Sequence, residues 1–125
     1  MKYVLMFTSR PDLREGVDPE RAQEVYGQIY QWFGEHAEAG RIVDGGAELH
    51  DVDTATTVKA TEAGEVVVVD GPFSEAKEVV GGFTVIDVPD MDAAIAMTKT
   101  WPALEFPGTA IEIRPMVVDY SQFEG

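Results

Sequence analysis

The sequence predicts an α+β fold of ferredoxin-like type, in which a sheet carries two long helices on one face. Apolar segments typical of strands alternate with only two long segments of helical period, in the order β-α-β-β-β-(short α)-β-α-β. The chain has 125 residues, which is enough to bury one hydrophobic core. We therefore expect residues 1–125 to form a single domain.

The first third of the chain is predicted to form a strand and a long helix. Residues 3–7 are an unbroken apolar run, which is typical of a strand covered on both faces. Asp18 is a good N-cap, Pro19 suits the first helical position, and Gly40 suits the position just past the helix end. Between these signals the apolar residues follow a helical period: Ala22, Val25, Ile29, Trp32 and Phe33.

The middle of the chain is predicted to contain a strand followed by a hairpin. Residues 41–49 form a strand that Gly45 and Gly46 interrupt, most simply by a β-bulge. Residues 56–61 and 65–70 form a hairpin around residues 62–64. This hairpin is an insertion in the ferredoxin-like order of elements.

The last third of the chain is predicted to hold a strand, a helix and a final strand. Residues 74–79 suit one helical turn, and residues 82–88 form a strand. Asp90 caps the second long helix, and Pro102 ends it. Residues 110–116 form the last strand. The apolar face of the second helix consists of Met91, Ala94, Ile95, Thr98 and Trp101.

The apolar strands also predict a partner. Two helices cover only one face of the sheet, yet residues 3–7 and 66–69 show no polar alternation. Their second face must therefore be covered as well. A second copy packed sheet to sheet around a two-fold axis is the economical solution, so we expect a homodimer that forms a dimeric α+β barrel.

Composition excludes several classes of function. Nine Lys and Arg against twenty-three Asp and Glu give a net charge of 9 − 23 = −14. Such a chain repels phosphate backbones and anionic membranes, so we expect no nucleic-acid or membrane partner. There is no cysteine for disulfides or thiolate metal sites. The apolar run near the N-terminus is shorter than the roughly 7–15 residues of a signal peptide, so we expect a cytoplasmic protein.

Asp70 is the first candidate catalytic residue, because it ends an apolar strand where side chains often project into a cleft. A carboxylate there acts as a base if burial raises its pKa. Alternatively, Asp70 caps its own turn through the local hydrogen bond that an Asp-Gly-Pro sequence favours. Glu75, Lys77 and Glu78 follow, and Lys77 suits an anionic group of a substrate while a glutamate moves a proton. Alternatively, these three are a solvated turn with weak ion pairs.

The histidines and one arginine complete the candidates. His50 is a candidate acid or base, and Asp51 and Asp53 beside it make too weak a set for a metal site. His36 lies near the end of the first helix, where the helix dipole favours its protonated form. Arg114, in the last strand, suits a substrate-binding role or a pair with Asp70. The common nucleotide, hydrolase and zinc-protease motifs are missing, so we expect no cofactor and no metal.

The run DGPFSEAKEVVGG at residues 70–82, with TTV before it and IRPM at residues 113–116, resembles the YCII-related family, in particular its DGPF-domain branch. The resemblance covers the chain from Lys2 to about Met116. It implies a dimeric α+β barrel and a largely uncharacterised bacterial function, often encoded beside extracytoplasmic-function sigma factors. The wider family implies a His–Asp acid/base couple. Where the family has its histidine, this chain has Glu24, Gln28 and Ile29, so dehalogenation chemistry is not expected.

Two functions follow from these observations. In the first, a small molecule binds in the barrel cleft, with Asp70 or His50 as acid or base and with Lys77, Glu75 or Arg114 orienting it. In the second, the chain is a non-catalytic regulatory or protein-interaction module linked to sigma-factor signalling. An enclosed cleft that holds Asp70 near His50, Lys77 or Arg114 would favour the first function.

Overall fold

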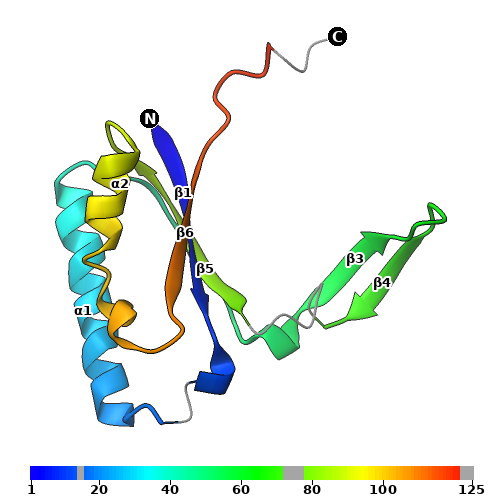
Figure 1. Cartoon of the computed structure of the whole chain (residues 1–125), viewed down its shortest axis with the longest axis horizontal. Coiled ribbons are helices and arrows are strands. Elements are labelled where there is room, and N and C mark those ends of the chain that lie inside the picture. Colours follow the sequence, from blue (N-terminus) through cyan, green and yellow to red (C-terminus); the bar gives the residue numbers. More distant parts are fainter. Residues whose placement is uncertain (14–15, 72–77, 122–125) are drawn as a thin grey trace.

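The computed structural model describes residues 1–13, 16–71 and 78–121, and it contains a four-stranded sheet, a separate two-stranded hairpin and two α-helices (Figure 1). The elements are β1 (Lys2–Ser9), η1 (Pro11–Leu13), α1 (Pro19–Glu38), β2 (Ile42–Glu48), η2 (Val52–Thr54), β3 (Thr56–Ala60), β4 (Val66–Asp70), β5 (Val79–Asp87), α2 (Met91–Thr98), η3 (Pro102–Glu105) and β6 (Ala110–Pro115). The predicted α+β class, with two α-helices, is confirmed. In the described part of the chain, neither α-helix is long and apolar enough to cross a membrane.

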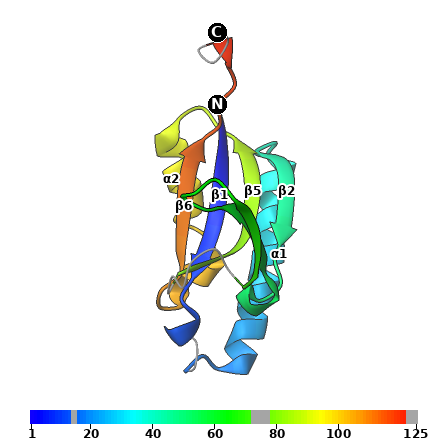
Figure 2. The same ribbon diagram turned by 90° about the vertical axis from the view of Figure 1, so that its right-hand side faces the viewer.

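The four-stranded sheet has the order β2-β5-β1-β6, and every neighbouring pair is antiparallel. Both α-helices lie on the same face of this sheet (Figures 1 and 2). With the hairpin set aside, the order of helices and strands is the β-α-β-β-α-β of ferredoxin-like folds. Among the described residues, no helix lies on the opposite face of the sheet.

The hydrophobic core lies between the sheet and the two helices. Alternate residues of β1 point into it, and Leu5 is fully buried, as is Ile86 of the neighbouring β5. From the helical layer, Trp32 and Met97 pack against the same cluster. The eight buried residues of this cluster all come from predicted strands or helices, so the centre of the core follows the sequence pattern.

The predicted starts of both helices and the predicted end of the first helix are confirmed. The Asp18 side chain accepts a hydrogen bond from the backbone N–H of Glu20, and Gly40 has a φ of 77° just past the helix. Asp90 accepts one from the N–H of Ala93. The second helix is shorter than predicted, since α2 ends at Thr98, whose hydroxyl bonds back to the Ile95 carbonyl. Such side-chain bonds compete with continuation of the helix.

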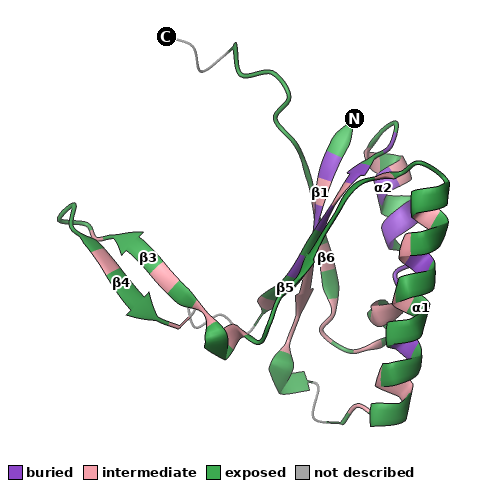
Figure 3. Cartoon of the chain, turned by 180° about the vertical axis from the view of Figure 1, so that it is seen from behind, coloured by how far each residue is buried: buried purple, intermediate pink, exposed green. Residues whose placement is uncertain are grey.

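The hairpin of β3 and β4 stands away from the sheet as an arm (Figures 1 and 3). The sequence predicted residues 66–69 to be a strand covered on both faces, and this is wrong for the single chain. Val66 is 72% exposed and Val68 is 68% exposed, and Val58 opposite Val68 is 66% exposed. Neither helix covers this arm, because it is a separate two-stranded sheet rather than part of the main one. The predicted turn at residues 74–79 lies largely outside the described residues.

Candidate functional site

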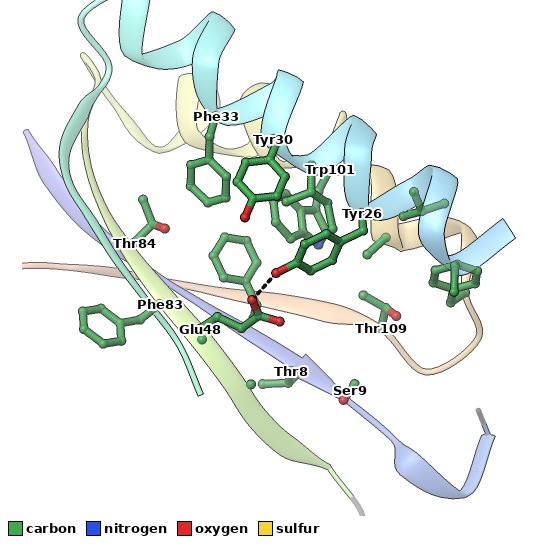
Figure 4. Close-up of a pocket in the computed structure, with 18 of the residues that line it drawn as sticks. Thr8, Ser9, Tyr26, Tyr30, Phe33, Glu48, Phe83, Thr84, Trp101 and Thr109 are labelled. Atoms are coloured by element: carbon green, nitrogen blue, oxygen red, sulfur yellow. Dashed lines mark hydrogen bonds between the residues drawn. The ribbon is translucent and has the colours of Figure 1, made fainter. Parts of the chain in front are cut away.

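A cleft of about 560 Å³ lies between α1 and the helix-covered face of the sheet (Figure 4). Side chains from α1, β1, β2 and β5 line it, together with residues that follow α2. It opens to solvent at one side, where Tyr30 is 69% exposed. Most of the lining is apolar, with a few polar groups near the opening, which is the usual composition of a small-molecule site.

Aromatic rings form the floor of the cleft. Phe7 of β1 and Trp101, which follows α2, are stacked with 4.2 Å between their ring centroids and 26° between their planes. Phe33 of α1 meets Trp101 edge to face at 5.7 Å. The indole N–H of the neighbouring Trp32 donates to the Thr100 hydroxyl at 2.8 Å, which fixes the turn that presents Trp101. The floor is therefore built from three elements that are far apart in the sequence.

Two tyrosines and a glutamate form the wall near the opening. Tyr26 and Tyr30 are four residues apart on α1, so they share one helix face, and their rings meet edge to face at 5.4 Å. The Tyr26 hydroxyl donates to Glu48 Oε2 at 2.6 Å (Figure 4). This hydrogen bond, helped by the charge of Glu48, raises the pKa of Tyr26 to about 12. Tyr26 is thus a neutral hydrogen-bond donor at physiological pH.

The predicted bulge in β2 sets the position of Glu48. The register between β2 and β5 shifts on both sides of Asp44, and Gly46 has a φ of 70°. Asp44 Oδ1 accepts a hydrogen bond from the Gly46 N–H at 2.7 Å. The buried Thr84 hydroxyl donates to the Gly45 carbonyl at 3.1 Å. The bulge re-aims the end of the strand, so that Glu48 meets the tyrosines of α1.

Hydroxyl groups from β1 and from the loop before β6 line the opposite side of the cleft. Thr8, Ser9 and Thr109 are half-buried there (Figure 4), and Thr8 donates to the Ala110 carbonyl at 3.4 Å. Among the described lining residues, Glu48 carries the only formal charge. The cleft therefore combines an aromatic floor, neutral hydroxyls and one carboxylate.

The predicted catalytic residues do not line this cleft. Asp70 is exposed at the end of β4, at the base of the arm, and the following Gly71 donates its N–H to the Ala55 carbonyl at 2.7 Å. His50 is exposed in the segment between β2 and η2, which also leads to the arm. Both residues therefore lie near the connections between the arm and the sheet.

The predicted substrate-binding residues are not brought together either. Arg114 is exposed on β6, and it alternates with Ile111 and Ile113, which pack against the core. It therefore lies on the sheet face opposite the cleft. Among the described residues, no ion pair joins Arg114 to Asp70. Glu75 and Lys77 lie outside the described residues.

His36 differs from the sequence-based expectation. Its ring packs on Trp32 with 4.4 Å between the centroids, and Nδ1 lies 3.0 Å from an Arg41 guanidinium nitrogen. Burial, followed by the charge of Arg41, lowers the pKa of His36, which is the opposite direction to the one expected from the helix dipole. No group of three or more His, Cys, Asp or Glu residues in the described ranges is arranged to hold a metal ion.

Sequence inspection missed the roles of Tyr26, Tyr30 and Glu48. From the sequence alone, Tyr26 and Tyr30 lie on a helical face and are most simply interpreted as core or interface residues. Two signals were nevertheless present: two tyrosines one helical turn apart, and an acidic residue two positions after the Gly-Gly bulge. Neither signal indicates that the two segments meet.

Comparisons with known proteins cover nearly the whole chain. The model of the YCII-related domain matches residues 1–117. An uncharacterised protein of Rhizobium meliloti is 32% identical over 118 residues, which are 94% of each chain. Among solved structures, a 5-chloro-2-hydroxyhydroquinone dehydrochlorinase from Burkholderia phenoliruptrix, in complex with 2,5-dihydroxybenzoquinone, matches with a TM-score of 0.48 and 15% identity, covering 90% of this chain and 91% of that one.

Proposed function

The chain belongs to the YCII-related domain family, and we propose that within it this protein binds a small organic molecule in the cleft between α1 and the sheet. One observation carries the proposal: a cleft of about 560 Å³, the size of a small ligand, has an aromatic floor beside the hydrogen-bonded pair of Tyr26 and Glu48. A few placed polar groups on an apolar lining orient a ligand and give specificity. The sequence resemblance further supports placing the chain in the DGPF-domain branch.

Acid/base chemistry by Asp70 and His50 is the finer part of this proposal. Neither residue lines the cleft within one chain, so each would act on a ligand only if a second copy or a movement of the arm brought it there. Tyr26 needs no such movement, because its neutral hydroxyl already lies at the opening. Ligand binding is therefore the main proposal. The role of Asp70 as a base is a further prediction, which Asp70→Asn tests.

Binding is tested with Tyr30→Ala in a thermal-shift screen of small aromatic and cyclic metabolites. Tyr30 is 69% exposed, so the variant should keep its free energy of unfolding within about 0.5 kcal/mol of the wild type. A ligand at 100 times its Kd stabilises the wild type by about 2.7 kcal/mol, a shift of several degrees. We expect Tyr30→Ala to lose most of that shift.

The matched control is Gln31→Ala, which changes the adjacent exposed residue of α1 outside the cleft lining. It should retain the full shift. Equal shifts in Tyr30→Ala, Gln31→Ala and the wild type would show that the ligand binds elsewhere. If no compound shifts the wild type, the proposed binding function is wrong for this set of ligands.

We also propose that the protein is a homodimer and that the uncovered sheet face and the arm form its interface. On that face Val4, Met6 and Val85 are half-buried, and Phe83, which is 39% exposed, points away from the cleft (Figure 4). The arm adds exposed valines on a two-stranded hairpin, a structure that is marginal on its own in water. The alternative function, a regulatory or protein-interaction module, would use this same apolar surface. A cytoplasmic location is proposed with the dimer.

The dimer is tested by light scattering on the Val58→Lys/Val68→Lys double variant. The wild-type mass is expected to be twice 13.7 kDa, and the variant should be a monomer because two charges replace a valine pair at the interface. The control Glu62→Gln/Glu65→Gln changes the net charge by the same two units, at the turn of the arm. A dimeric valine variant would exclude the arm from the interface, and a monomeric wild type would rule out the dimer.

A further inference from the structure

The described residues that line the cleft carry negative charge only. Among the described residues that line it, there is no lysine or arginine, and Glu48 supplies one carboxylate. Glutamate side chains are generally ionised at neutral pH. Oε2 of Glu48 accepts the Tyr26 hydrogen bond, while Oε1 accepts none from the described residues. The cleft opening therefore offers a carboxylate oxygen to whatever enters.

Aromatic rings surround the space beside this carboxylate. Phe7, Phe33 and Trp101 form the floor, and Tyr26 and Tyr30 form the wall, so aromatic side chains line the cleft on two sides. Ring pairs in this set meet at both stacked and edge-to-face angles, so their faces point in different directions. The face of an aromatic ring attracts a positive charge, and several such faces together are the usual surroundings of a bound ammonium group.

An anionic ligand would meet the opposite conditions. Its carboxylate or phosphate would approach Glu48 with no described lysine or arginine in the lining to balance it, on a chain of net charge −14. The hydroxyls of Thr8, Ser9 and Thr109 can bind polar groups but carry no charge. The lining thus favours a ligand with a positive group near Glu48 and an apolar body on the aromatic floor.

We propose that the ligand class of the cleft is a small organic cation, namely an amine or quaternary ammonium group on an apolar, ring-sized body. This inference rests on the proposed function, because it names the class of molecule that the same cleft binds. The ammonium group lies between Glu48 and the rings of Tyr26 and Tyr30. The apolar body packs on Phe33 and Trp101.

The test compares three molecules of nearly the same shape: 2-phenylethylamine, 2-phenylethanol and phenylacetate, which are a cation, a neutral alcohol and an anion. Binding to the full chain is followed by NMR through the indole N–H signal of Trp101, which lines the cleft. The indole N–H signal of Trp32, which does not line it, is the reference. We expect the amine to bind about tenfold more tightly than the alcohol, which corresponds to about 1.4 kcal/mol. Phenylacetate should bind more weakly than the alcohol.

Glu48→Gln should remove the preference for the amine over the alcohol, because it removes the carboxylate charge while glutamine can still accept the Tyr26 hydrogen bond. Glu38→Gln, at the exposed end of α1 and outside the lining, makes the same change in net charge and should leave all three affinities unchanged.

The possible results distinguish the cation inference from the proposed binding function on which it rests. If the alcohol shifts the Trp101 signal and the amine binds no more tightly, or phenylacetate binds best, the cation inference is wrong and the binding function stands. If the preference for the amine survives Glu48→Gln, the cation is held elsewhere and the inference is likewise wrong. If none of the three, nor any compound of the metabolite screen, shifts Trp101, both proposals fail.

Discussion

Gly46→Ala is expected to lower the free energy of unfolding by roughly 2–6 kcal/mol, the sum of about 1–3 for backbone strain and about 1–3 for overpacking. Gly46 has a φ of 70°, a conformation that residues with a side chain rarely adopt. A Cβ at this position would lie 1.8 Å from the Phe83 carbonyl oxygen and 2.6 Å from its carbon. Both contacts are with backbone of the neighbouring strand, which cannot move aside as a side chain would.

The neighbouring glycine provides the control. Gly45 has no positive φ, and a Cβ there would meet nothing within 4 Å, so Gly45→Ala should cost far less than Gly46→Ala. Urea denaturation measures both variants. Equal losses of unfolding free energy in the two variants would contradict the explanation from the positive φ of Gly46 and its backbone contacts.

Gly46→Ala also has a local consequence at the site. If the bulge rearranges, Glu48 moves away from Tyr26, and the cause of the raised pKa of Tyr26 is lost. We expect that pKa to fall from about 12 towards its ordinary value of 10, as followed by the absorbance of ionised tyrosine at high pH. If the variant loses stability but the pKa of Tyr26 stays raised, the bulge does not position Glu48.

The helices and strands were predictable wherever a few neighbouring residues determine the backbone. Asp18 and Asp90 each satisfy a backbone N–H within three residues of themselves, and Gly40 supplies the left-handed conformation that ends α1. The β2 bulge was predictable for the same reason, since adjacent glycines mark it. These signals are local, so they are visible in the sequence alone.

The cleft was not predictable, because its parts meet only through tertiary structure. Tyr26 and Glu48 are 22 residues apart, and nothing in either segment indicates that a strand bulge turns the glutamate towards the helix. The pKa of His36 likewise depends on contacts that the sequence does not reveal. Its position near a helix end favours protonation, while burial and Arg41, which comes after the helix, lower its pKa.

The arm shows a different limit. Four consecutive valines at residues 66–69 have the composition of a covered strand, and composition does not say which surface covers it. In a single chain this strand is largely exposed, and the proposed homodimer would explain the pattern by covering it. The apolar composition was therefore visible in the sequence, while the position of the strand outside the main sheet was not.

Trp101→Ala is expected to have the other large effect, a loss of about 3–5 kcal/mol in the free energy of unfolding. Trp101 is only 8% exposed, it stacks on Phe7, and it meets both Trp32 and Phe33 edge to face at 5.0 and 5.7 Å. Such a loss is a large share of the roughly 5–15 kcal/mol that stabilise an ordinary domain. Urea denaturation followed by circular dichroism gives the value, with Leu104→Ala, at a 39% exposed position in the following turn, losing much less.

A second variant, Trp101→Phe, distinguishes the role of Trp101 in packing from its role in ligand binding. Phenylalanine keeps an aromatic ring on Phe7 and restores part of the lost contact, so the protein should stay folded with a smaller loss of stability. It also removes the larger indole face from the floor of the cleft, so the affinity for 2-phenylethylamine should fall while the protein remains native. A Trp101→Phe protein that is less stable but binds the amine as tightly as the wild type would assign Trp101 to the core alone. The ligand would then rest on the tyrosine wall and Glu48.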